Sequence, residues 1–123
     1  VREGTATVEG NEMTGNRVGL TVADAVFGCF AGNLMAGNLE TGLALKNTAN
    51  LEVSGNAVVG NGVNGLVLNG VAGLVDGNMI MDNGSRGVGV ISFKGALTGN
   101  IFEANGEYAL GLDGAGAVDA RGN

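Results

Sequence analysis

The chain has 123 residues, of which 45% are apolar, 25 are glycine and none is proline or histidine. This length suits a single domain, and an apolar content too high for a disordered glycine-rich linker indicates a folded chain with many turns. Six basic against twelve acidic residues give a net charge of −6. Nucleic-acid binding is therefore disfavoured, because no basic stripe is present to neutralise phosphates.

The absence of histidine removes the commonest acid–base group and the commonest metal ligand. The single cysteine, Cys29, cannot form an internal disulfide, and without a histidine partner we interpret it as a small, inert apolar residue. The most apolar window, residues 18–39, is interrupted by Asp24 and Asn33, so we expect no membrane span. We expect no catalytic residue, no metal site and no cofactor.

From the N-terminal end onwards, asparagine recurs with a period of 22 or 23 residues. In each period a short strand runs into a Gly-Asn pair, with an apolar residue three positions before the asparagine, as Val8 stands before Asn11. The backbone must turn sharply at this pair, and both glycine and asparagine tolerate the left-handed conformation. This first asparagine series consists of Asn11, Asn33, Asn56, Asn78, Asn100 and Asn123.

A second short strand follows each Gly-Asn pair. Because side chains alternate along a strand, an apolar residue two positions after the asparagine points inward and its two neighbours point outward. In the middle units both outward rows are apolar, whereas Glu12 and Glu103 stand at the ends. We predict that the outward apolar residues form an exposed strip that contacts another surface. This predicted contact face consists of Leu34, Ala36, Ala57, Val59, Met79, Met81 and Ile101.

A second asparagine series ends this strand, five residues after the first series. It consists of Asn16, Asn38, Asn61, Asn83 and Asn105. In the later units a glycine follows, and Asn-Gly is a turn signal in its own right. The sequence leaves open whether these side chains point into the core or outward.

A third strand, with a Leu-x-Leu pattern, completes the unit. Its expected outward residues are small or apolar, namely Thr21, Ala44, Val67, Gly89 and Gly111. The nearest polar residues fall one turn away on different coils, namely Asp24, Lys46, Asn69 and Asp113. Asp76 and Asp82 form the closest local pair of carboxylates. Glycoside hydrolysis needs two carboxyl groups about 5–10 Å apart, but positions around the Asn78 corner equally suit solvated turn residues, which we favour.

The strand before each Gly-Asn pair has a more polar expected exterior. Its outward residues are Thr7, Glu9, Cys29, Glu52, Ser54, Asp76, Thr98, Asp119 and Arg121. We interpret this row as an ordinary hydrated face.

Strands this short are not stable alone, so each must stack on the equivalent strand of the next unit. At the ~4.8 Å spacing of stacked strands, each asparagine of the first series can donate to one neighbouring carboxamide and accept from the other. We therefore predict a buried structural ladder formed by Asn11, Asn33, Asn56, Asn78 and Asn100.

Two other repeat classes fit less well: leucine-rich repeats need more leucine, and calcium-binding nonapeptide repeats need a Gly-Gly-x-Gly-x-Asp motif that the chain lacks. A 22-residue coil with three strands and a Gly-Asn corner resembles the right-handed parallel β-helix of the pectate-lyase-like superfamily. We predict an all-β fold of this kind, a β-solenoid with about five and a half coils. The chain starts at Val1 and stops at Asn123 inside the pattern, so we expect residues 1–123 to be a single β-helix segment of a longer protein.

Two functional hypotheses follow. The first is a structural or interaction module of a secreted or surface-exposed protein, whose contact face packs on a partner, on another copy of the chain or on a further part of the same chain. The second, implied by the resemblance, is a segment of a polysaccharide-active enzyme (a lyase, epimerase or glycoside hydrolase) whose catalytic coils lie outside this sequence. The resemblance also implies an extracellular or cell-envelope location. Passive carbohydrate binding has only Tyr108 as an exposed aromatic candidate, and ice binding would need regular outward threonine rows, which are missing.

Overall fold

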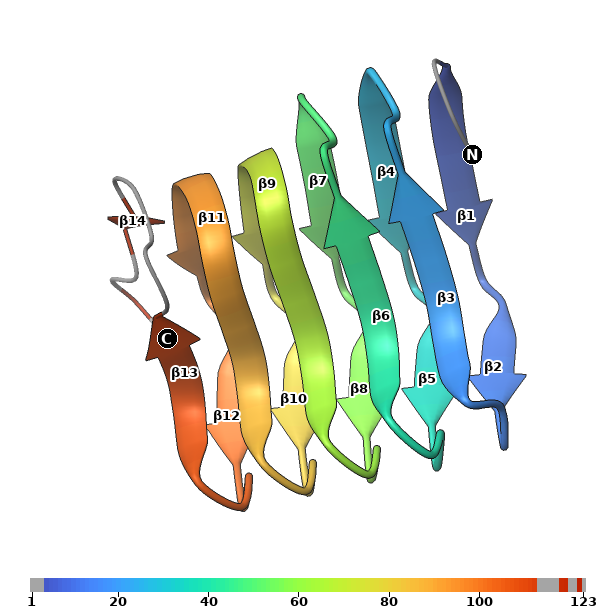
Figure 1. Cartoon of the computed structure of the whole chain (residues 1–123), viewed down its shortest axis with the longest axis vertical. Helices are drawn as coiled ribbons and strands as arrows, with labels where there is room; N and C mark the ends of the chain where they lie inside the picture. Colours follow the sequence, from blue (N-terminus) through green and yellow to red (C-terminus); the bar gives the residue numbers. More distant parts are fainter. Residues whose placement is uncertain (1–3, 113–117, 120–121, 123) are drawn as a thin grey trace.

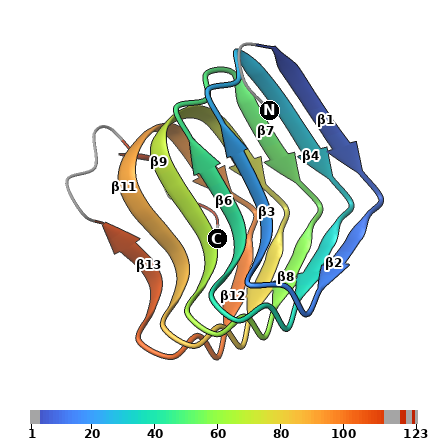
Figure 2. The ribbon, with the colours of Figure 1, turned by 45° about the vertical axis from the view of Figure 1, so that its right-hand side comes forward.

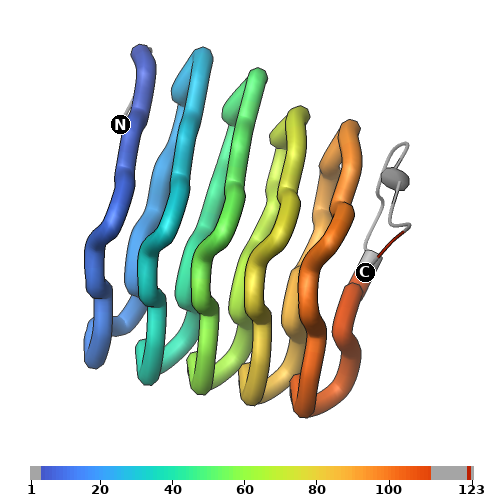
Figure 3. Tube along the Cα trace, turned by 180° about the vertical axis from the view of Figure 1, so that it is seen from behind, coloured from blue at the N-terminus to red at the C-terminus, as the bar shows by residue number. Residues whose placement is uncertain are grey.

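The computed structural model describes residues 4–112, 118–119 and 122. Within these residues the chain forms strands and turns and no helix. It winds as a parallel β-solenoid of about five turns, and each turn lies on the one before it (Figures 1 and 3). The predicted all-β, parallel β-helix fold is confirmed.

One side of the solenoid is a short sheet of three-residue strands that follow the first asparagine series. Neighbouring strands pair in parallel and in register, for example Met79 with Ala57 and with Ile101. In the described part of the chain this short sheet consists of β2 (Glu12–Thr14), β5 (Leu34–Ala36), β8 (Ala57–Val59), β10 (Met79–Met81) and β12 (Ile101–Glu103).

The rest of each coil belongs to a long sheet with two halves. The corner half runs into the Gly-Asn pairs and contains β1 (Thr5–Glu9), β4 (Phe27–Ala31), β7 (Leu51–Ser54) and β14 (Val118–Asp119). The Leu half carries the Leu-x-Leu pattern and contains β3 (Val18–Ala23), β6 (Thr41–Lys46) and β13 (Tyr108–Leu112). Two longer strands, β9 (Asn64–Asp76) and β11 (Arg86–Thr98), run through both halves.

The continuity of β9 and β11 differs from the expected three strands in every coil. Leu45 of β6 pairs with Leu68 of β9, and Leu51 of β7 pairs with Gly73 of β9. Residues 46–50 lie between the two positions in the earlier coil, whereas only residues 69–72 lie between them in β9. The shorter connection lets the chain bend without leaving the sheet, and Gly73, at φ 147°, lies at the bend. Between residues 64 and 103 the chain therefore forms two strands per turn, one long and one short, instead of three.

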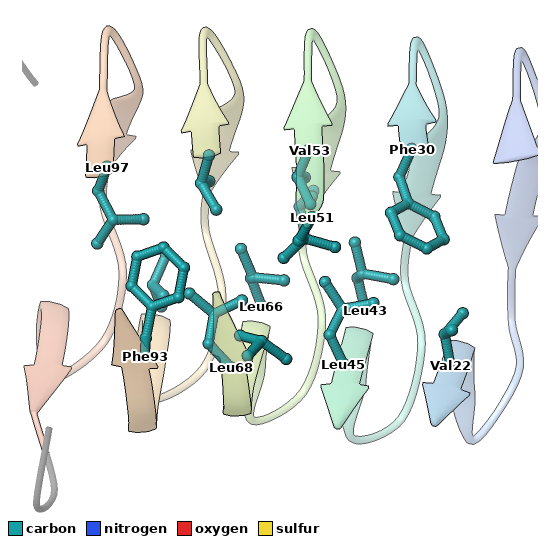
Figure 4. Packing of buried hydrophobic residues seen from close by; sticks show 14 of the residues in the cluster. Val22, Phe30, Leu43, Leu45, Leu51, Val53, Leu66, Leu68, Phe93 and Leu97 are labelled. Atoms are coloured by element: carbon teal, nitrogen blue, oxygen red, sulfur yellow. The ribbon is translucent and has the colours of Figure 1, made fainter. Parts of the chain in front are cut away.

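The core fills the bore of the solenoid with apolar side chains from both sheets. Figure 4 shows those of the long sheet, including the rings of Phe30 and Phe93. Phe30, Val53 and Leu97 point inward from the corner half, and Leu43 and Leu66 point inward from the Leu half. All five are at most 1% exposed, and full burial of such a side chain contributes about 1.5–3 kcal/mol. The alternation read from the sequence therefore places these residues correctly.

The sharp turn before each first-series asparagine is made by the glycine. Gly32, Gly55 and Gly77 have φ values of 62°, 61° and 64°, whereas none of the described ladder asparagines has a positive φ. Our expectation that asparagine itself adopts the left-handed conformation is therefore wrong. Glycine takes that conformation without a steric cost and leaves the asparagine free to point its side chain inward.

Candidate functional site

The predicted contact face lies on the outer surface of the short sheet. Each of its strands directs the middle residue inward, as Met35, Val58 and Ile80 are 0–1% exposed, and the two flanking residues outward. Met79 and Ile101 are 44% and 55% exposed. The face thus runs along the solenoid over β5, β8, β10 and β12, the row of short strands visible in Figures 1 and 2.

Along most of its two long edges, this face is bordered by glycines, which carry no side chain. In the row before the first asparagine series, a Cβ atom built on Gly99 would lie 2.9 Å from Oδ1 of Asp76. A Cβ atom built on Gly10, Gly32, Gly55 or Gly77 of the same row, or on Gly15, Gly37 or Gly60 on the other side, would have no other atom within 4 Å. These positions project into open space and carry no side chain. The contact face is therefore a flat apolar strip without side-chain walls along most of its length.

The strip ends in carboxylates. Glu12 on β2 and Glu103 on β12 are both exposed and stand in the same two outward rows as the apolar residues. Asp82, also exposed, takes the place of a bordering glycine after β10. The apolar centre is thus bounded by negative charge.

Directly behind the contact face, the first asparagine series forms the predicted ladder. The backbone N–H and the side-chain Nδ2 of Asn56 donate to Oδ1 of Asn78 at 3.0 and 2.9 Å, and Nδ2 also donates to the carbonyl oxygen of Phe30 at 2.8 Å. Each amide is thus bonded to both neighbouring coils. Side-chain bonds of this kind join Asn11, Asn33, Asn56, Asn78 and Asn100 in order. The predicted ladder is confirmed over these five residues, and Asn123 lies outside the described residues.

The second asparagine series also points inward, which answers the question that the sequence left open. Asn38, Asn61 and Asn83 are each 1% exposed. Nδ2 of Asn61 donates to Oδ1 of Asn83 at 2.9 Å and to the carbonyl oxygen of Met35 at 3.1 Å. Two parallel ladders therefore lie at the two ends of the short strands, and no buried side-chain nitrogen or oxygen of the described residues lacks a partner.

The outer surface of the Leu half carries a cation that the sequence analysis missed. Arg86 begins β11 and is the register partner of Asn64 and Tyr108. A Cβ atom built on Gly111 would lie 2.7 Å from Cδ and 2.8 Å from Nε of Arg86, so the arginine side chain lies across the bare backbone of this glycine. Arg86 thus departs from the expectation that only small or apolar residues cover this part of the outer surface. The signal was the pair Gly89 and Gly111, which leaves room for a long neighbouring side chain.

Asp24, Lys46 and Asn69, the polar residues near the Leu half that the structure describes, do not include a pair of carboxylates. Asn47 Nδ2 donates to Oδ1 of Asp24 at 3.2 Å, and Lys46 is the register partner of Asn69. Asp113 lies outside the described residues. The structure therefore places Asp24 beside an amide and Lys46 beside Asn69.

The corner half shows the polar exterior that its sequence predicts at most of the expected positions. Thr7, Glu9, Glu52 and Asp76 are exposed. Two large apolar side chains are exposed on the same half: Phe27, the register partner of Thr5, at 43%, and Leu74, the register partner of Glu52, at 39%. Nothing is described for the side chains of Asp119 and Arg121. The hydrated character thus holds where the structure describes this half, apart from Phe27 and Leu74.

Cys29 lies in the same row, between two carboxylates. Its Sγ donates to Oε1 of Glu9 at 3.9 Å. Burial raises the pKa of the Cys29 thiol above its ordinary value, and the negative charges of Glu52 and Glu9 add to this effect. A thiol whose pKa is raised is a poor nucleophile at neutral pH, in agreement with the interpretation of Cys29 as inert.

Asp76 and Asp82 flank the Asn78 corner on opposite sides of β10. Asp76 Oδ1 accepts a hydrogen bond from the Thr98 hydroxyl at 2.9 Å, and both aspartates are exposed. Among the described residues no three or more Asp, Glu or Cys side chains gather where they could hold a metal ion. The same residues include no helix long and apolar enough to cross a membrane.

A comparison with protein families supports the fold assignment along the whole chain. The family model described as the right handed beta helix region matches residues 1–123. No curated protein and no solved structure matches the chain. On the strength of the family match and the stacked parallel coils, the chain belongs to the right-handed β-helix family.

Proposed function

We propose that this chain is a rigid structural and interaction module that presents the contact face to another protein surface. The observation that carries the proposal is the contiguous outward-facing apolar strip of the short sheet, in which Met79 and Ile101 are 44% and 55% exposed and the other five residues are partly exposed. Apolar strips of this kind mark contacts with other molecules. We also propose an extracellular or cell-envelope location, which the resemblance to secreted β-helix proteins implies.

The two ladders support a scaffold role for the same sheet. Asn56 and Asn61 bracket the strand β8, and each is bonded to the coil on either side. A strand held at both ends has little freedom to shift against its neighbours. The contact face is therefore preorganised, which lowers the entropic cost of binding.

The experiment compares two sets of serine substitutions. The face variant Met79→Ser/Met81→Ser/Ile101→Ser should lower light scattering at high protein concentration and lower the binding of an apolar dye. The control variant Val26→Ser/Leu39→Ser removes side chains that are 61% and 72% exposed but lie outside the face, and it should change both readouts less. Both variants should keep the cooperative thermal transition of the parent chain. Equal effects of the two variants, or no effect of the face variant, would overturn the proposal.

A polysaccharide-active segment is the second candidate, and Arg86 is the observation that favours it. A guanidinium group lying on an open sheet beside Asn64 and Tyr108 can bind the carboxylate of an acidic sugar. Because the catalytic coils of this candidate lie outside the sequence, the test is the binding of uronate polymers to the chain. Binding that the variant Arg86→Gln loses would favour the enzyme segment and count against a purely structural role, whereas absence of binding would count against this candidate.

A further inference from the structure

The charges of the described residues are divided unevenly between the faces of the solenoid. Glu12, Glu103 and Asp82 stand on or beside the contact face. Lys46, Arg86 and Lys94 lie on the long sheet, and Arg17 is paired with Glu40 at 2.7 Å. A molecule that covers the contact face therefore meets an apolar centre with carboxylates at both ends.

A second copy of the chain fits this face poorly. Five strands about 4.8 Å apart and three residues of about 3.3 Å each give an area of roughly 24 by 10 Å. Two such faces would bury roughly 500 Å², so a contact through this face alone belongs to the weak, transient class whatever its partner. In a symmetric pair the carboxylates of Glu12 and Glu103 would also face carboxylates, because an isologous interface uses the same patch twice.

We propose that the occupant is a cationic amphipathic helix of a partner protein, which lies along the solenoid axis across β5, β8, β10 and β12. This inference rests on the proposed function and gives the chemistry of the partner. The helix pitch of about 5.4 Å is close to the strand spacing of about 4.8 Å, so successive apolar side chains of the helix meet successive strands. The bare glycine rows leave room for a cylinder about 10 Å across.

The ends of the strip define where the partner carries its charges. Glu12 and Ile101, beside Glu103, are separated by four strand steps, which is about 19 Å at the spacing of a sheet. A helix covers that distance in about 13 residues. The partner helix thus has Lys or Arg about 13 residues apart, on either side of an apolar stripe, and pairs them with Glu12 and Glu103.

The test uses three synthetic helical peptides of equal length and the whole chain. The first has a Leu/Ala stripe with lysines at both ends, the second has glutamates in place of the lysines, and the third has the composition of the first with the stripe scrambled. Binding is measured by fluorescence anisotropy at low and high salt. We expect the lysine peptide to bind best and to weaken as salt is added, because its end charges pair with exposed carboxylates.

Three variants separate the contributions of the end charges and of the apolar side chains to binding. Glu12→Gln/Glu103→Gln should weaken binding of the lysine peptide by about three- to tenfold and remove most of its salt dependence. Glu9→Gln/Glu52→Gln removes two carboxylates from the corner half and should leave binding unchanged. The face variant Met79→Ser/Met81→Ser/Ile101→Ser should abolish binding of all three peptides.

Each outcome decides a separate point. Equal binding of the lysine and glutamate peptides, or binding that the Glu12/Glu103 variant does not weaken, would overturn the cationic partner and leave the contact face standing. Binding of the scrambled peptide as well as the striped one would overturn the helical geometry. Absence of any peptide binding would overturn this inference, whereas the dye and light-scattering comparison decides the proposed function independently.

Discussion

A ladder asparagine combines three hydrogen-bonding roles in one side chain. Oδ1 of Asn78 accepts from the backbone N–H and Nδ2 of Asn56, while its own Nδ2 donates to Asn100 and to the carbonyl of Val53. Aspartate lacks the donor and serine lacks the reach. The carboxamide therefore satisfies polar groups of three successive coils, although it is only 2% exposed.

Replacement of Asn78 by alanine should lower the free energy of unfolding by about 1–3 kcal/mol, because the backbone N–H of Asn56 and the carbonyl oxygen of Val53 would lose their bonds to this buried side chain. Asn11→Ala is the matched control. Asn11 is exposed at the edge of the described coils, so its loss should cost less than half as much. Chemical denaturation measures both values, and equal losses at the two positions would contradict the ladder as a buried network.

At this scale, the position of a side chain can be predicted from the sequence where the same residue recurs in every coil. Asn33, Asn56 and Asn78 could be placed from their period alone, because stacking gives equivalent residues equivalent surroundings. Arg86 occurs once in its row, and its position depends on the flexible side chain and on the bare backbone of Gly111. Periodicity carries no information about such a contact.

At the scale of strands and turns, the repeat tolerates residues other than glycine at a position where the backbone is left-handed. The residue before each second-series asparagine is left-handed: Gly60 has φ 65°, whereas Asp82 and Ala104 occupy the equivalent position with φ 54° and 53°. A left-handed alanine costs about 1–2 kcal/mol relative to a right-handed conformation. The turn geometry thus comes from the stacked coils, and the local sequence conforms to it.

A reciprocal pair of variants tests this turn. Ala104→Gly should stabilise the chain by about 0.5–1 kcal/mol, since relief of the left-handed strain exceeds the greater chain entropy of glycine. Gly60→Ala should destabilise it by a similar amount, because the new Cβ has open space but the wrong backbone angle. Thermal unfolding of the two variants measures the difference, and shifts of the same sign would contradict the assigned geometry.

The strand pattern was predictable from sequence in type but not in number. The inward positions of β5, β8 and β10 follow from alternation about Met35, Val58 and Ile80. The fusion of strands into β9 and β11 depends on one residue fewer in the connection, a difference that the period alone hides. The glycine at each corner could be identified from the sequence, but the sequence did not show that this glycine, and not the asparagine after it, takes the left-handed conformation.

At the scale of the whole molecule, the solenoid separates its tasks by face. The long sheet supplies most of the core and carries the described cations Lys46, Arg86 and Lys94, while the short sheet combines two buried ladders with an apolar exterior. A face held at both ends of every strand is suited to rigid contact. The sequence could predict which residues point outward but not what covers them. The exposure of a residue depends on the fold of this chain alone, whereas a contact depends also on the surface of the partner.

The methionines of the chain provide the most direct measurement of that contact. Met79 is 44% exposed and Met81 is partly exposed on the contact face, whereas Met35 is fully buried and serves as the internal reference. Mild peroxide oxidation followed by mass spectrometry compares the purified chain with the same protein in its native source. The proposed function predicts that Met79 and Met81 oxidise readily in the purified chain and are protected in the native source. Oxidation of both at the same rate in the two samples would contradict it.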